Sequence, residues 1–220
     1  MNVFLKLITV SAIVLLVFTL FNNSVNFSFA KSHGINGFVN QNIIPICCAW
    51  GPELKSGILT YSIQGGDKKI DTGVKNAVDS WNRVLNGMQF KRIAAATTTT
   101  GGDGNIIISF INDGKLVAGK TTNTIDSNGF IRQSYITLSK KSFNHPFSAS
   151  QIALVTKHEL GHVLGLEHAN FNGNLMTFQV NIGSGTISPC VIDAVNTANA
   201  WKLKEGGISM HGPTKKYVVC

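Results

Sequence analysis

The chain has 220 residues, of which 44% are hydrophobic and 14% are charged, and its formal net charge is +8. This composition excludes a disordered chain, and the length allows one domain with a substantial hydrophobic core. The basic residues are scattered, without a dense run or interleaved aromatic residues, so we expect no nucleic-acid partner.

Residues 1–30 have the three-part layout of a secretory signal. Lys6 precedes an apolar run that extends to Phe21, and Ser28 and Ala30 supply the small residues that a cleavage site requires. The mature protein is therefore expected to be secreted and extracellular. The alternative is an uncleaved anchor that holds the domain outside a membrane, because the stretch from Val3 to Phe21 could just span a bilayer if the Lys6 side chain reached the membrane surface.

Four cysteines agree with export, namely Cys47, Cys48, Cys190 and Cys220. Because neighbouring cysteines seldom pair with each other, we expect two disulfides that join the first two cysteines to the last two, in an order that the sequence leaves open. Residues 31–56 contain the first pair and are predicted to form an N-terminal segment, for which a short pro-segment is one interpretation.

Five stretches have the composition of strands, and a helical pattern lies between the first two. The strands are predicted at 57–63, 89–93, 105–111, 118–125 and 130–139. The helix is predicted over 71–85, where apolar residues recur at helical spacing. A strand, a helix and a further strand in this order favour a sheet with parallel members.

Two more helices follow the predicted strands. Ser148 or Ser150 can cap the first helix, and Ser188 with Pro189 is a typical start for the second. The tail from 206 to 220 is predicted to be irregular.

The first of these helices carries His158 and His162. Residues four positions apart lie about 40° apart around a helix and roughly 6 Å apart along it, so both imidazoles can reach one ion. Gly165 can end the helix in the left-handed conformation, which leaves His168 free to be a third ligand. Three neutral imidazoles leave one tetrahedral position of Zn²⁺ open, as in catalytic zinc sites.

Glu159 follows the first histidine and lies on nearly the same side of the helix. Its carboxylate can act as general base toward a water held by the metal, and can then pass the proton to a leaving amine. The expected reaction is hydrolysis assisted by one catalytic Zn²⁺ ion. Because the ligands must be deprotonated, activity is expected to fall at acid pH as metal is lost.

The stretch from His158 to His168 reads H-E-L-G-H-V-L-G-L-E-H and resembles the zinc motif of the metzincin metallopeptidases. The order of the predicted elements over about residues 55–205 looks like a matrixin catalytic domain. The resemblance implies an α+β fold with a twisted, mixed sheet of about five strands, a long helix in the N-terminal half, a zinc-binding helix and a C-terminal helix. It also implies a peptidase domain at 57–205, followed by the tail.

The same resemblance assigns roles to residues outside the motif. Met176 looks like the methionine of a Met-turn, which supports the three imidazoles, and residues 118–125 correspond to an edge strand that takes an extended peptide as an added strand. Phe178 stands where astacin-like relatives have a tyrosine. Because phenylalanine has no hydroxyl donor, zinc and Glu159 are expected to stabilise the oxyanion and transfer the proton.

Segments that hold a structural zinc and calcium in matrixins are not matched, and we predict no second metal. Asp103, Asp113 and Asp126 lie in loops where they could bind Ca²⁺, but we expect them to form turns instead. An alternative role for Cys47 or Cys48 is a thiolate ligand that keeps the enzyme latent, although the arginine of the matrixin latency segment is absent here.

These features predict a secreted zinc-dependent endopeptidase that acts on protein or peptide substrates. A membrane is expected as a partner only if the leader stays uncleaved. The alternative function is a secreted zinc-containing binding or adhesion protein without proteolytic activity.

Overall fold

The computed structural model describes residues 41–95, 104–112, 118–142, 145–178, 185–200 and 211–220. The predicted leader, residues 1–30, lies outside these ranges, and so do Asp103 and Asp113. Within the described ranges, no helix is both long enough and apolar enough to cross a membrane.

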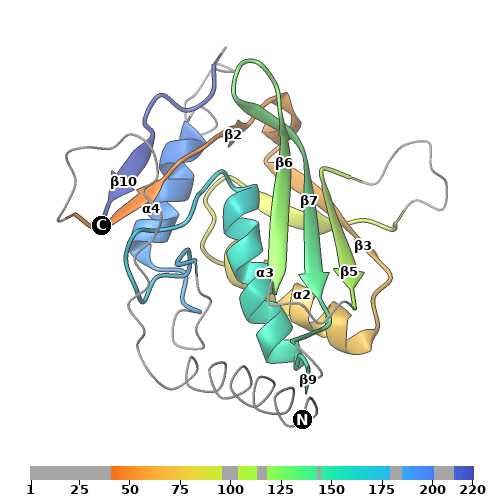
Figure 1. The fold of residues 1–220 in the computed structure, drawn as a ribbon. Helices are drawn as coiled ribbons and strands as arrows, with labels where there is room; N and C mark the ends of the chain where they lie inside the picture. Colours follow the sequence, from red (N-terminus) through yellow and green to blue (C-terminus); the bar gives the residue numbers. More distant parts are fainter. Residues whose placement is uncertain (1–40, 96–103, 113–117, 143–144, 179–184, 201–210) are drawn as a thin grey trace, which may run out of the picture. The chain divides into compact units, whose positions relative to one another are not determined.

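A six-stranded mixed sheet is the central feature of the described residues (Figure 1). Its order is β2-β7-β5-β3-β4, and β6 also pairs with β7. The strands are β2 (Ala49–Trp50), β3 (Ile58–Gln64), β4 (Gln89–Arg92), β5 (Ile106–Ile111), β6 (Gly119–Ile125) and β7 (Phe130–Ser139). All pairings are parallel except that of β6 with β7. The α+β fold and its five predicted strands are confirmed, and the two-residue β2 joins them.

Hydrophobic patterning distinguishes the central strands from the edge. Ile106, Ile107 and Ile108 of β5 are all buried, because this strand lies between two neighbours and both of its faces are covered. In β6 the residues alternate between half-buried and exposed along most of the strand, as expected for a strand with one covered face. This alternation decides which β6 side chains face the rest of the domain.

Helix α2 (Lys68–Asn82) buries one side, which includes Val74 and Trp81. The predicted bounds of 71–85 were three residues late, because the Asp67 side chain caps the helix by accepting a hydrogen bond from the Ile70 N–H (2.9 Å). A Cβ added at Gly73 would lie 2.6 Å from a side-chain carbon of Ile152. Glycine at position 73 therefore allows α2 to pack closely against the next helix.

Helix α3 (Ala149–Val163) and helix α4 (Pro189–Ala198) begin where the sequence predicted. Of the two candidate caps for α3, Ser148 is the one used, and it forms a capping box with Gln151. Ser188 caps α4, with proline at the first helical position. Figure 1 shows α3 lying alongside β6, which brings the predicted metal helix to the edge of the sheet.

Short elements complete the description, namely η1 (Pro52–Leu54), β8 (Lys141–Ser142) and β9 (His145–Pro146). In addition, β1 (Ile43–Pro45) pairs antiparallel with β10 (Tyr217–Val219). The prediction of an irregular tail was therefore wrong for its end. Val218 is buried and pairs with Ile44, so hydrophobic burial orders this short strand.

The predicted disulfide pairing was also wrong. Cys47 is bonded to Cys48, and Cys190 is bonded to Cys220. The β1–β10 pairing brings the C-terminal residue next to α4, where its Cα lies 5.6 Å from that of Cys190. The two neighbouring cysteines lie instead beside the end of α3 and bond with each other.

Candidate metal centre

Two of the predicted ligands project from the last turns of α3, and carbonyl oxygens hold both rings. The Nδ1 atom of His158 lies 2.6 Å from the Leu175 carbonyl oxygen, and that of His162 lies 2.8 Å from the Leu166 carbonyl oxygen. A carbonyl can only accept, so each Nδ1 carries the proton and each Nε2 presents its lone pair. Both rings are therefore oriented as metal ligands.

The third ligand reaches the site because the chain turns sharply after α3. Gly165 has φ +95°, the left-handed conformation expected from the sequence. Beyond Gly165 the chain pairs with the N-terminal segment. The Glu167 N–H donates to the Pro45 carbonyl oxygen (2.9 Å), and Leu166 forms an antiparallel β-bridge with Ile46. This pairing fixes the stretch that carries His168.

The three rings meet with a geometry that suits a single ion. The candidate ligand atoms of His158, His162 and His168 lie within 4.8 Å of one another. The Nε2 atoms of His158 and His162 are 3.2 Å apart. Two nitrogens that share a tetrahedral Zn²⁺ at the usual bond length would be about 3.3 Å apart. The three histidine nitrogens therefore suit a Zn²⁺ ion. Among the described residues, these histidines form the group of three potential metal ligands that lie close enough together to hold one ion.

The environment favours the neutral, metal-binding form of the histidines. Burial, followed by the nearby His162, lowers the pKa of His158 to about 4, although its bond to Leu175 acts in the opposite direction. Desolvation and His162 also lower the pKa of His168 to about 4, although its side chain is partly exposed. Burial likewise lowers the pKa of His162. At neutral pH the three imidazoles are therefore uncharged, each with a single ring proton.

Glu159 follows His158 on α3, and only 4% of its surface is exposed. Burial raises the pKa of its carboxyl group to about 7, against a smaller lowering by the hydrogen bond from Thr121. The Thr121 hydroxyl donates to Oε2 of this carboxyl group over 2.7 Å. A carboxyl group with a pKa near neutrality suits both proton acceptance and proton donation.

Met176 packs against helix α3 at Gly161. It is fully buried, and a Cβ added at Gly161 would lie 2.3 Å from its sulfur. The neighbouring Leu175 supplies the carbonyl that holds His158, so the turn orients a ligand as well as supporting the helix. Phe178, two residues further on, places its ring centroid 5.0 Å from that of His168.

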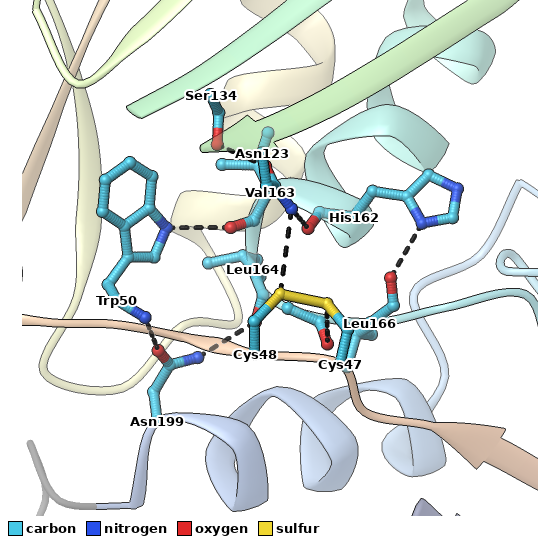
Figure 2. Close-up of a disulfide and its surroundings, with 11 residues drawn as sticks. Cys47, Cys48, Trp50, Asn123, Ser134, His162, Val163, Leu164, Leu166 and Asn199 are labelled. Atoms are coloured by element: carbon cyan, nitrogen blue, oxygen red, sulfur yellow. Dashed lines mark hydrogen bonds between the residues drawn. A yellow bond between two sulfur atoms is a disulfide. The ribbon is translucent and has the colours of Figure 1, made fainter. Parts of the chain in front are cut away.

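The last carbonyl groups of α3 and of the turn after it receive four donors from three distant parts of the chain (Figure 2). The bonds are Asn123 Nδ2 to His162 O (3.0 Å), Trp50 Nε1 to Val163 O (2.8 Å), Asn199 Nδ2 to Leu164 O (3.1 Å) and Cys47 N–H to Gly165 O (3.0 Å). A helix leaves its last carbonyls without intrahelical partners, so these donors replace the missing bonds. They hold the segment between the second and third ligands.

The Cys47–Cys48 disulfide lies beside this segment, as Figure 2 shows. Its sulfurs lie close to Asn123 Nδ2 (3.9 Å) and to the Gly165 carbonyl oxygen (3.4 Å). All four cysteines of the chain are in disulfides, so neither sulfur is a thiolate available to a metal. The alternative role as a latency ligand is therefore not the one adopted in this structure.

Asp126 forms a turn, and no cation site is needed to explain it. Its carboxylate accepts hydrogen bonds from the backbone N–H groups of Asn128 (2.9 Å) and Phe130 (3.0 Å), and it pairs with Arg132. These bonds, led by that from Phe130, lower its pKa. The same arginine also pairs with Glu53 at 2.9 Å.

Sequence reasoning identified the three histidines that the structure brings together, and Glu159 on the same helix, but it missed the residues around them. Thr121 and Asn123 contact α3, and Gly119 lies against Glu159. The sequence carried a signal for them. Small or polar residues stand at the alternate positions 119, 121 and 123 of the predicted edge strand, and these positions share the covered face. Such a face is usually apolar, so polar residues there indicate specific partners.

One comparison with known proteins, that with protein families, agrees with this site. The family model described as matrixin matches residues 50–189, which is more than half of the chain. One solved structure of myroilysin has 16% identity and a TM-score of 0.35, over 51% of this chain and 43% of that one. A second has 15% identity and a TM-score of 0.35, over 64% of this chain and 60% of that one. The match thus spans less than two thirds of either structure, and no curated protein matches the sequence.

Proposed function

This chain belongs to the matrixin family of metallopeptidases, and from that membership we propose that it is a zinc-dependent endopeptidase that hydrolyses proteins or peptides. The observation that carries the proposal is the convergence of three imidazoles beside one buried carboxyl group. His158, His162 and His168 would hold one Zn²⁺ ion, and Glu159 would act as the general base.

Zn²⁺, when bound, polarises the scissile carbonyl group and makes a nearby water more acidic. Glu159 takes a proton from the attacking water, because its pKa of about 7 leaves much of the carboxyl group ionised at neutral pH. The protonated carboxyl group then returns this proton to the departing amine. Phe178 has no hydroxyl group and takes no part in this transfer.

The edge of the sheet supports a peptide substrate. Strand β6 pairs with β7 along one edge, and no strand among the described residues pairs with its other edge. An extended peptide can add to such an edge through backbone hydrogen bonds, which recognise a peptide independently of its side chains. Because β6 lies alongside α3, a peptide on this edge would pass near the histidines.

We further propose that the protein is exported and that residues 1–30 are its signal. The three-part layout of the leader and the two disulfides support this location. Sequencing the N-terminus of the protein recovered from the medium tests it, with a start after Ala30 expected. Retention of the intact leader in the membrane fraction would instead support the uncleaved anchor.

The test of the enzymatic proposal compares the wild-type chain with Glu159→Gln and with Glu167→Gln as a matched control. Glu167 belongs to the same motif, but its side chain is exposed and is not part of the proposed mechanism. All three proteins should contain one zinc. Cleavage of a peptide library should persist in the control and fall by about 100-fold or more in Glu159→Gln.

One result would count against hydrolysis itself, and another would count against the role of Glu159. Zinc-loaded wild type that cuts no peptide in the library would support the alternative, a zinc-containing binding protein. Cleavage that is equally fast in Glu159→Gln would leave hydrolysis in place and remove Glu159 as the general base.

A further inference from the structure

The covered face of β6 consists of Gly119, Thr121 and Asn123, and all three residues contact α3. The first two lie against Glu159, and the third donates to the carbonyl oxygen of His162. Because side chains alternate along a strand, these residues share one face while the backbone remains available at the edge. Strand β6 therefore contacts both the proposed base and the last helical turn of α3, which carries His162.

Thr121 makes the most direct of these contacts. Its hydroxyl group lies 2.7 Å from Oε2 of Glu159 and 3.2 Å from the backbone carbonyl oxygen of the same residue. A hydroxyl group has one hydrogen, so the shorter contact with the carboxyl group is the stronger bond. This bond engages one carboxyl oxygen and leaves the other outside the interaction.

Gly119 confines the second carboxyl oxygen. A Cβ added at position 119 would lie 2.6 Å from Oε1 of Glu159 and 2.7 Å from a methyl carbon of Val155. Real Cβ atoms do not approach other atoms so closely, so the carboxyl group occupies space that only glycine leaves open. The backbone at Gly119 does not have a positive φ, so this glycine is required by the space and not by its conformation.

Asn123 connects the strand to the metal helix. Its side-chain amide donates to the His162 carbonyl oxygen (3.0 Å), and its oxygen accepts from the hydroxyl group of Ser134 on β7 (2.6 Å). Strand β6 is thus held at a defined position relative to α3. The contacts of Thr121 and Gly119 with Glu159 depend on this position.

We propose that β6 positions the general base, with Thr121 as the positioning residue that holds the Glu159 carboxyl group and Gly119 as the site that makes room for it. This inference rests on the proposed function, because it assigns a task to residues around the base of that reaction. A peptide that added to β6 would meet a carboxyl group held by the same strand. Substrate alignment and base alignment would then share one element.

The first experiment measures kcat and KM for Thr121→Val, Thr121→Ser and Gly119→Ala in the zinc-loaded protein. Displacing a reacting group by about 1 Å can cost about 100-fold in rate, so kcat should fall at least about tenfold in Thr121→Val and Gly119→Ala, with KM within about twofold. Thr121→Ser keeps the hydroxyl group and should restore most of kcat.

Thr137→Val is the matched control, because this half-buried threonine of β7 lies on the opposite face of the sheet from Ser134. It should keep the wild-type kcat. Wild-type kcat in Thr121→Val would overturn the inference while leaving the proposed function intact. If kcat fell equally in Thr121→Val and in Thr121→Ser, the inference would also be overturned, because the hydroxyl group would then not be what positions Glu159.

A second measurement does not depend on activity. The melting temperatures of metal-free Thr121→Val, Glu159→Ala and the double variant form a mutant cycle, and residues in contact give non-additive shifts. We expect the two single shifts not to add. Additive shifts would overturn the contact even if the wild type proved to be inactive, so failure of the inference and failure of the proposed function are distinguishable.

Discussion

The carbonyl oxygen of Cys48 lies where a side chain at residue 165 would have to be. A Cβ added at Gly165 would be 2.2 Å from this oxygen, and the same glycine has φ +95°. The glycine of the zinc motif therefore has two functions. It turns the chain toward His168, and it lets the N-terminal segment pass beneath the turn.

This relationship predicts a large loss of stability in Gly165→Ala. Left-handed backbone strain and a clash with a backbone atom should together cost about 3 kcal/mol or more. Gly173→Ala is the control, since Gly173 also has a positive φ (77°) but has open space around it, and should cost about 1 kcal/mol. Urea unfolding of both variants measures the difference. Equal losses would show that the chain easily moves away from position 165.

The two buried tryptophans that donate to α3 should differ in importance. Trp50 donates to the carbonyl oxygen of Val163, which lies at the helix end and lacks an intrahelical donor. Trp81 donates to the carbonyl oxygen of Lys157, which lies inside the helix and also accepts from a backbone N–H of the helix. Trp50→Phe leaves a buried acceptor without a partner and should cost about 1–3 kcal/mol more than Trp81→Phe. Chemical unfolding tests this, and an equal or greater cost for Trp81→Phe would contradict it.

The disulfides should contribute unequally to stability. The Cys190–Cys220 bond joins residues 30 positions apart, and in the chain-entropy model its removal costs about 3–4 kcal/mol. The bond between Cys47 and Cys48 joins adjacent residues, so it closes no long loop and should add little stability through chain entropy. The double variant Cys190→Ala/Cys220→Ala should therefore unfold at a much lower urea concentration than Cys47→Ala/Cys48→Ala, and the reverse order would contradict the entropic argument.

Metal-free protein should lose stability as the pH falls from about 6.5 toward 4. The folded-state pKa values of His158 and His168 are about 4, below the usual value of 6.5, so the unfolded chain binds more protons within this window. Glu159 acts in the opposite direction, because its raised pKa of about 7 gives the folded state an extra proton between pH 4.5 and 7.

Urea unfolding as a function of pH measures this dependence. The metal-free Glu159→Gln variant lacks the opposing contribution and should show a steeper loss of stability between pH 6.5 and 4.5 than the wild type. Zinc-loaded protein should stay more stable than metal-free protein at pH 7, because the metal binds the folded state. A shallower slope in Glu159→Gln would show that burial does not raise the pKa of this carboxyl group.

Much of this protein could be predicted from local sequence patterns. The spacing of His158 and His162 follows from the period of a helix, and Gly165 follows from the conformation that ends one. Ser148 and Ser188 act as caps through contacts with residues three positions away. Strand positions were readable because alternation and apolar runs reflect burial directly.

The remaining features depended on which distant segments meet in the folded chain. No local pattern shows that Trp50 and Asn199 bond to the end of α3, or that the hydroxyl group of Thr121 reaches Glu159. The disulfide pairing was decided in the same way, since β10 brings Cys220 to α4. The sequence by itself determined the cluster of three histidines and the place of Glu159 on the same helix, because these follow from the geometry of one helix and one turn. Only the tertiary structure decided what holds them, because those contacts join residues whose separation in the sequence says nothing of their separation in space.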